Sequence, residues 1–281
     1  MTTTKSPPSE IISVSDLEWQ EHQPGIRMKS LWADPATNRR ALMTRIEPGA
    51  GLPRHRHVGD ELLYVIEGAI SDDFGTVTAG NMGYRPDGCV HAVSSKNGAT
   101  VLAIITGDIE PTSETGSTLP SLIFALSDLP WIDTRPGVRQ KRIWEDKASE
   151  RRAILARFEP GATLPPHRHI GDELIFLIEG ANADESGPVP TGNMNYWPWA
   201  DPRSHGAAVE ARSTVQTVTG WSRPATHTSP RGVKRRSSAS AAAPSARTRL
   251  TSSSVTTIWA SSSRVSRSSR LVTLTVSPIT R

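Results

Sequence analysis

The stretch "LPRHRHVGDELLYVIEGAISDD", residues 52–73, returns in the same chain as "LPPHRHIGDELIFLIEGANADE", residues 164–185. Sliding the chain by 112 residues aligns the two copies without a gap, and the match runs from Asp16 to Pro86 of the first copy. A long internal repeat at a fixed spacing indicates a duplicated structural unit. The sequence therefore predicts two domains of the same architecture, each with a histidine-rich segment.

The repeat also sets the expected boundaries. The polar stretch "EPTSETGSTLPS" between the copies has the composition of an exposed linker. We expect an N-terminal extension, a first domain, a linker, a second domain and a C-terminal tail, over residues 1–15, 16–110, 111–125, 126–221 and 222–281, respectively.

Short apolar runs dominate each copy, and the signal for helices is weak. Runs such as "ELLYVIEG", "ATVLAIIT", "ELIFLIEG" and "TVQTVTG" are bounded by Pro-Gly, Asp-Gly or Gly-Asn pairs. Short strands separated by turn signals about every 8–12 residues are typical of an all-β sandwich or barrel. We therefore predict two β-barrels.

Composition limits the class of protein. Of the 281 residues, 36% are hydrophobic and 21% are charged, as in a globular protein. No apolar run approaches the roughly 18–20 residues of a membrane helix, so we expect no membrane partner. The N-terminus lacks the apolar core of a secretory signal, and the single cysteine, Cys89, excludes an internal disulfide. A cytoplasmic location is expected.

The C-terminal tail differs in charge from the body. Residues 222–281 contain eleven Lys or Arg and no Asp or Glu, whereas residues 1–221 carry the other 21 basic residues and all 28 acidic ones. The tail is rich in Ser, Thr, Arg and Ala, without periodicity, which predicts a disordered basic segment. It could be a basic arm for nucleic acid or an acidic surface, or the product of a reading-frame shift. We favour the interpretation without a nucleic-acid partner.

The first copy contains a candidate metal site. His55, His57 and Glu61 would share one face of a strand, but six residues of strand span about 20 Å, too far for ligands of one ion. We therefore expect a hairpin turn at residues 59–60 that brings the glutamate back to the histidines. His91, just after a Pro-Asp-Gly turn, is the expected fourth ligand, and such a set suits a first-row divalent ion.

The second copy keeps only part of this pattern. His167, His169 and Glu173 match the first three ligands, but the repeat places Arg203 where the fourth histidine would be. His205 lies two residues later and could still face inward, because side chains on a strand alternate with a period of two. A second metal site is thus the weaker prediction.

The first copy resembles the cupin superfamily in the spacing of both its motifs, with Ser95 as a departure outside the ligand set. The surrounding residues are similar to ChrR-type cupins, known from anti-sigma factors, and to dioxygenases that cleave acetylacetone or dihydroxyacetophenone. The resemblance implies a double-stranded β-helix, or jelly roll, in each half of residues 16–221. The motif residues are Gly49, His55, His57, Glu61 and Gly68, then Gly80, Pro86, Gly88 and His91.

Several functions fit this resemblance. The preferred hypothesis is a metal-dependent dioxygenase that cleaves a small dicarbonyl or aryl ketone and binds one or two divalent ions (Fe, Zn, Mn or Ni). The alternative is a ChrR-like sensor that binds zinc or a small ligand without catalysis. An isomerase or a purely structural metal site has no specific support. Two-barrel chains of this kind act as homodimers or as pseudo-dimers of their own halves, and the sequence leaves both open.

Overall fold

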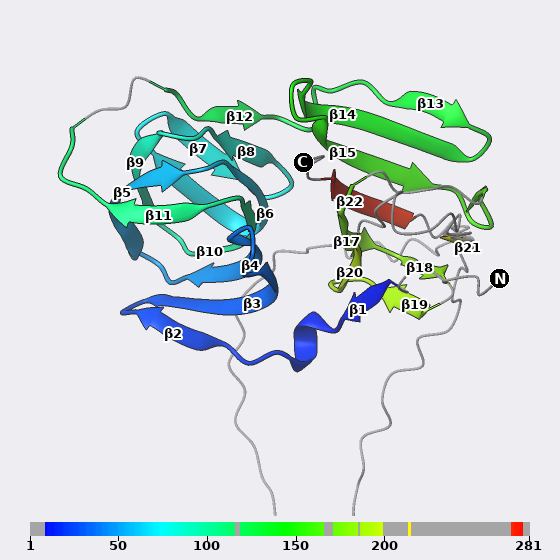
Figure 1. Ribbon diagram of the computed structural model, residues 1–281, viewed down its shortest axis with the longest axis horizontal. Helices are drawn as coiled ribbons and strands as arrows, with labels where there is room; N and C mark the ends of the chain where they lie inside the picture. The colour runs from blue at the N-terminus through cyan, green and yellow to red at the C-terminus, as the bar shows by residue number, and fades with distance from the viewer. Residues whose placement is uncertain are drawn as a thin grey trace, which may run out of the picture. The chain divides into compact units, whose positions relative to one another are not determined.

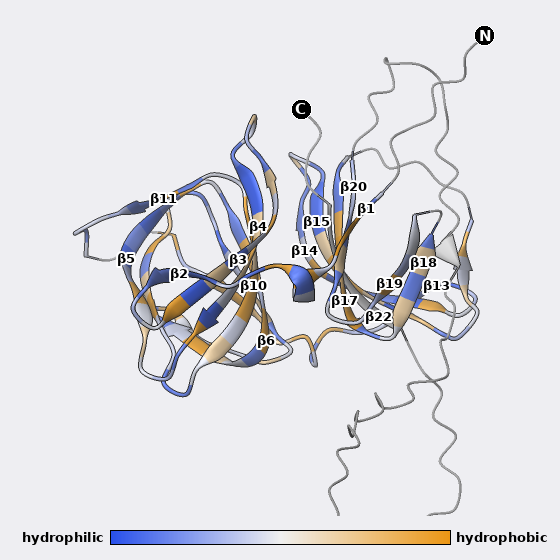
Figure 2. Ribbon diagram, turned by 90° about the horizontal axis from the view of Figure 1, so that it is seen from below, coloured by the Kyte–Doolittle hydropathy of each residue, from blue (hydrophilic) through white to orange (hydrophobic). Residues whose placement is uncertain are grey.

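The computed structural model describes residues 9–115, 119–165, 171–184 and 186–198, and the backbone of two further strands, 213–214 and 271–277. Strands dominate these residues, and a short 3-10 helix, η1 (Val14–Asp16), is the one helix among them. Figure 2 shows hydrophilic and hydrophobic residues mixed along the strands. No helix in the described part of the chain is long and apolar enough to cross a membrane. The predicted all-β architecture is confirmed.

The first barrel is built from strands β2 to β11, which lie on the left of Figure 1. Its main sheet runs in the order β11-β5-β9-β6-β10-β4-β3-β2, and β7 and β8 pair with β6. Its strands are β2 (Gln20–Gln23), β3 (Ile26–Asp34), β4 (Arg39–Ile46), β5 (Gly51–Val58), β6 (Glu61–Asp72), β7 (Gly75–Thr78), β8 (Met82–Arg85), β9 (Val90–Ser94), β10 (Ala99–Ile105) and β11 (Asp108–Pro111).

Two strands of this barrel, β6 and β10, have both faces buried. Leu63 and Val101 belong to the apolar cluster inside the barrel. Their neighbours Leu62 and Leu102 point the other way, into a second cluster that also contains residues of the other half, such as Phe176. The continuous apolar runs of the sequence follow from this double burial, since a half-exposed strand would alternate with polar residues.

The second barrel repeats most of this arrangement. Its sheet runs in the order β20-β17-β22-β15-β14-β13, with β18 paired to β19 and β16 paired to β21. Its strands are β13 (Ile132–Arg135), β14 (Val138–Asp146), β15 (Arg151–Phe158), β16 (Thr163–Leu164), β17 (Glu173–Glu179), β18 (Ala181–Asp184), β19 (Gly187–Pro190), β20 (Met194–Trp197), β21 (Ser213–Thr214) and β22 (Leu271–Ser277).

Strand β22 comes from the segment that we expected to be a disordered tail. It pairs with β15 and with β17, the two neighbours that correspond to β4 and β6 around β10 in the first barrel. Residues 271–277 thus add a strand to the second sheet, between β15 and β17. The rest of the tail lies outside the described residues.

Each half also lends a short strand to the other. Strand β1 (Glu10–Ile12) pairs with β20 of the second barrel, and β12 (Leu122–Phe124) pairs with β8 of the first. These two strands are related by the 112-residue shift, as are the strands that receive them. We call residues 9–12 and 121–124 the arms; the sequence placed them in the N-terminal extension and in the linker.

Polar contacts between the halves follow the same reciprocity. Arg39 binds Asp172 through Nη2, 2.7 Å from Oδ2, and its counterpart Arg151 binds Asp60. Two aromatic pairs between the halves also correspond to each other. Ring centroids lie 4.8 Å apart in the Trp32–Tyr196 pair and 4.7 Å apart in the Tyr84–Trp144 pair. The two halves therefore meet as the subunits of an isologous dimer would, within one chain.

Candidate metal centre

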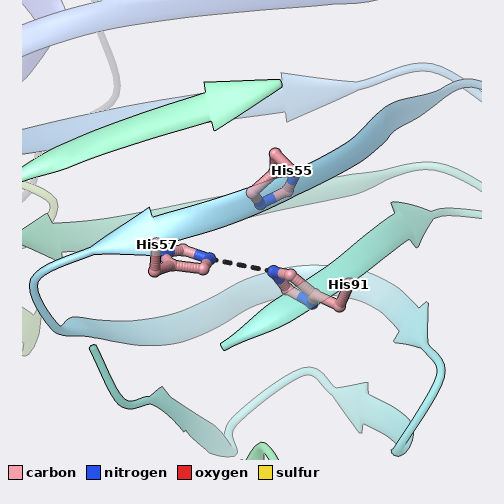
Figure 3. A group of neighbouring side chains, drawn as sticks. All are labelled: His55, His57 and His91. Carbon is pink, nitrogen blue, oxygen red and sulfur yellow. Dashed lines mark hydrogen bonds between the residues drawn. The ribbon is translucent and has the colours of Figure 1, made fainter. Parts of the chain in front are cut away.

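Three buried histidines converge inside the first barrel. His55 and His57 lie on β5, and His91 lies on β9, directly opposite His55 in the strand pairing. Their ligand atoms all lie within 4.8 Å of one another, and Nε2 of His57 is 2.9 Å from Nε2 of His91. Figure 3 shows these two rings pointing toward each other. The three predicted histidine ligands are therefore brought together.

The turn at residues 59–60 is present, but the predicted hairpin is wrong. Strand β5 ends at Val58 and β6 begins at Glu61, as expected. The two strands do not pair with each other, since β9 lies between them in the sheet order. The chain turns a corner of the barrel instead, so that consecutive strands approach one site from different directions.

Glu61 lies beside the three histidines without joining their tight group. Its Oε2 is 3.8 Å from Nε2 of His57, and the side chain is largely buried. Its role as a fourth ligand stays a prediction.

Hydrogen bonds fix the orientation of two of the rings. Nδ1 of His55 lies 2.8 Å from the carbonyl oxygen of Pro53, and Nδ1 of His91 lies 3.1 Å from Oδ2 of Asp72. A neutral ring that donates from Nδ1 leaves the lone pair of Nε2 free for a metal. A carboxylate behind a ligand histidine is the usual arrangement in metal sites, where it fixes the ring and raises its basicity.

Asp72 is held by a buried network that the sequence did not reveal. Oδ2 accepts hydrogen bonds from Nη2 of Arg85 at 2.7 Å and from Oγ of Ser121 at 3.1 Å, in addition to the contact with His91. Oδ1 accepts from the backbone N–H groups of Phe74 and Gly75. Ser121 belongs to the arm of the second half, so that half completes the support of the first-barrel site. The sequence signal that could have identified Ser121 is the repeat, because it aligns the two arms with each other.

The family model of the ChrR cupin-like domain matches residues 8–110 and 120–220. The chain belongs to the ChrR cupin-like domain family. No protein with curated annotation matches it. The cupin fold expected from the sequence is thereby confirmed.

Solved structures share the fold of this ChrR cupin-like chain at low identity. A candidate glyoxylate-induced protein from Pseudomonas aeruginosa is 13% identical, with a TM-score of 0.59, over 100% of this chain and 92% of that one. A candidate dioxygenase from Nostoc punctiforme is 14% identical, with a TM-score of 0.60, over 74% and 79%. A mutant oxalate decarboxylase from Bacillus subtilis is 15% identical, with a TM-score of 0.57, over 99% and 78%.

The electrostatics of the site suit a metal ion. Burial lowers the pKa of His57 to about 4 and also lowers that of His55, so both rings are neutral at pH 7, as metal ligands must be. Burial raises the pKa of Glu61, but attraction to His57 and His91, which are charged only when protonated at acidic pH, and to the permanent charge of Arg85 outweighs burial and lowers the pKa overall. Neutral imidazoles beside an ionised carboxylate can hold a divalent first-row ion.

The second barrel differs at the same place. Glu173 begins β17 and lies opposite Trp197 on β20, whereas Glu61 lies opposite Arg85 in the first barrel. The counterpart of Asp72, Asp184, accepts hydrogen bonds from Asn195 and from the arm residue Ser9. The predicted ligands His167, His169 and His205 lie outside the described residues, so the second site stays a prediction.

Proposed function

We propose that this chain is a metal-dependent dioxygenase that cleaves a small dicarbonyl or aryl ketone at the first-barrel site. The observation that carries the proposal is the convergence of His55, His57 and His91 beside Glu61, with Asp72 orienting His91 from behind. A divalent ion bound there would supply Lewis-acid polarisation of a carbonyl oxygen and open positions for small ligands.

The protein's own residues support this chemistry in two ways. Hydrogen bonds from Nδ1 hold His55 and His91 in the tautomer that presents Nε2. The interior of the same barrel is filled by a buried apolar cluster that includes Leu63 and Ile105, and such a packed interior holds little water. Exclusion of water strengthens every electrostatic interaction at the site. The fold is compatible with that of the candidate dioxygenase from Nostoc punctiforme.

The full chain is the right material for the test, because β22 is part of the second sheet. Bound metals are measured after purification, and oxygen uptake is followed with iron(II) and β-diketones or hydroxyaryl ketones. We expect uptake with at least one substrate. Tightly held zinc without uptake for any substrate would contradict the dioxygenase proposal.

Substitution of one ligand tests the site itself. His57→Ala should remove the first-barrel metal and the oxygen uptake, while the strands keep their circular-dichroism signal. The matched control is His22→Ala on β2, since His22 is exposed and remote in the strand order. Unchanged metal content in His57→Ala would refute the site.

Membership of the ChrR cupin-like family favours a second candidate, a sensor that binds zinc or a small ligand without turnover. The two candidates differ in their response to metal exchange. A sensor should retain zinc and bind its ligand unchanged, whereas the dioxygenase should gain activity when zinc is replaced by iron(II).

A further inference from the structure

A buried arginine stands next to the candidate metal centre. Arg85 is the last residue of β8, and its side chain is 1% exposed. It lies directly opposite Glu61 in the pairing of β8 with β6. Opposed residues in an antiparallel pair point to the same side, with Cβ atoms about 4.5–5.5 Å apart. Arg85 therefore starts from the same inward face as the carboxylate beside His57.

Only part of this guanidinium group has a partner. Nη2 donates to Oδ2 of Asp72, whereas Nε and Nη1 are buried and have no hydrogen-bond partner among the described residues. These two nitrogens carry three of the five N–H donors of an arginine. A buried charged donor without an acceptor is costly, and such groups in native proteins usually find one. The free donors thus indicate an acceptor that binds from outside the chain.

The chain makes room for the guanidinium group in this position. A Cβ atom added to Gly83 would lie 2.0 Å from Nη1 of Arg85, so the guanidinium group would have to move away. The second barrel has Asn195 and Trp197 at the corresponding positions, and Asn195 takes over the contact to the aspartate. The pair of a glycine and an arginine is therefore particular to the first barrel, the one with the described histidine cluster.

The charges at the site indicate which charge the acceptor of these hydrogen bonds should carry. Both oxygens of Asp72 accept hydrogen bonds, so this carboxylate is ionised and balances Arg85. Glu61 is then the one negative charge without a balancing cation. Together with a divalent metal ion it would leave the site with a net charge of +1. A ligand with a single negative charge would neutralise the site and accept from the free donors, as carboxylates do with arginine.

We propose that Arg85 binds the carboxylate of a small oxo-carboxylate whose carbonyl group faces the metal centre, and that Gly83 keeps the guanidinium group in place. The proposal rests on the proposed function and narrows its substrate from dicarbonyl compounds in general to those in which one carbonyl belongs to a carboxylate. In this proposal Arg85 binds the substrate, and Asp72 positions Arg85 through their hydrogen bond.

The test compares two molecules of nearly the same shape, pyruvate and butane-2,3-dione, which differ in the carboxylate. Their binding to the metal-loaded full chain is measured by calorimetry. Because a hydrogen bond to a charged group contributes about 1.5–3 kcal/mol, pyruvate should bind at least about tenfold more tightly than the dione. Equal affinities would overturn the proposal.

Two variants locate the effect. Arg85→Lys keeps the charge next to Asp72 but lacks the planar fork, and Gly83→Ala displaces the guanidinium group with one methyl group. Both should lose at least about tenfold in pyruvate affinity, with unchanged affinity for the dione and unchanged metal content. The control is Arg56→Lys, since Arg56 lies between the two β5 histidines but pairs with Glu114 at the surface.

Every outcome bears on the proposal. Pyruvate affinity that is unchanged in Arg85→Lys would overturn it, and so would loss of the metal in both variants, because Arg85 would then belong to the framework of the metal site. Oxygen uptake with neutral diketones alone would refute the oxo-carboxylate and leave the dioxygenase intact. Binding of pyruvate that depends on Arg85, without oxygen uptake for any substrate, would refute the dioxygenase alone.

Discussion

The two barrels agree where they touch each other and differ where they would touch a ligand. Across the interface, Arg39 and Arg151 make the same ion pair in opposite directions. At the site, Arg85 of the first barrel is replaced by Trp197 in the second. The interface constrains both copies at once, since each contact needs a residue from either half. The interior of each barrel is free of that constraint, so the two interiors could diverge.

The largest effect is expected from the interface. Removal of Arg39 or Arg151 leaves a largely buried aspartate of the other half without its cation, and truncating one partner of such a pair costs about 2–5 kcal/mol. Arg39→Ala and Arg151→Ala should each lower the urea midpoint by a similar amount. The control is Arg139→Ala, whose ion pair with Asp133 is exposed and should contribute little.

These arginine variants also test the reciprocity itself. If only one of the two interface variants is destabilised beyond the Arg139→Ala control, the halves do not meet as equivalent partners. Similar shifts in both would support a pseudo-dimer formed within one chain.

A smaller effect is expected from the arms, and it should differ between the barrels. Ser121→Ala removes one donor from Asp72, so it should cost about 0.5–1.5 kcal/mol of unfolding free energy and weaken the first-barrel metal about tenfold. Ser9→Ala removes the corresponding donor from Asp184 and should leave the first-barrel metal unchanged. Metal affinity is measured by competition with a chelator. The first-barrel ion is identified as the one that is absent from the His57→Ala variant.

The arm variants separate two interpretations of Ser121. Equal weakening of the first-barrel metal by Ser9→Ala would show that the effect is a general loss of stability. Unchanged affinity in Ser121→Ala would show that the arm merely covers the site.

Much of the fold could be predicted because local sequence patterns indicate it. Short apolar runs and turn pairs predicted the all-β fold, and the repeat predicted the duplication. The three histidines could be predicted because they belong to closely spaced motifs. Arg85 and Ser121 could not, since their roles depend on strand pairing and on an arm that crosses from the other half. Strand β22 was missed for the same reason: nothing local links residues 271–277 to a sheet whose other strands end near residue 197.

The smallest effect is expected at acidic pH, from the turn that carries the interface arginine. Hydrogen bonds from Arg39 and then Thr37 lower the pKa of Asp34 to about 2, below the value of about 3.9 for an unfolded chain. A carboxyl group with a lowered pKa stabilises the fold above the unfolded value, and this contribution disappears as the pH falls through about 4 to 2. The stability gap between the wild type and Asp34→Asn should therefore narrow over that range in urea unfolding. The gap between the wild type and Asp146→Asn should also narrow toward acidic pH, because Ser149 and Arg151 in the other half lower the pKa of Asp146. If the stability difference between the wild type and either variant widens toward acidic pH, the charge of the aspartate in the turn does not stabilise the fold.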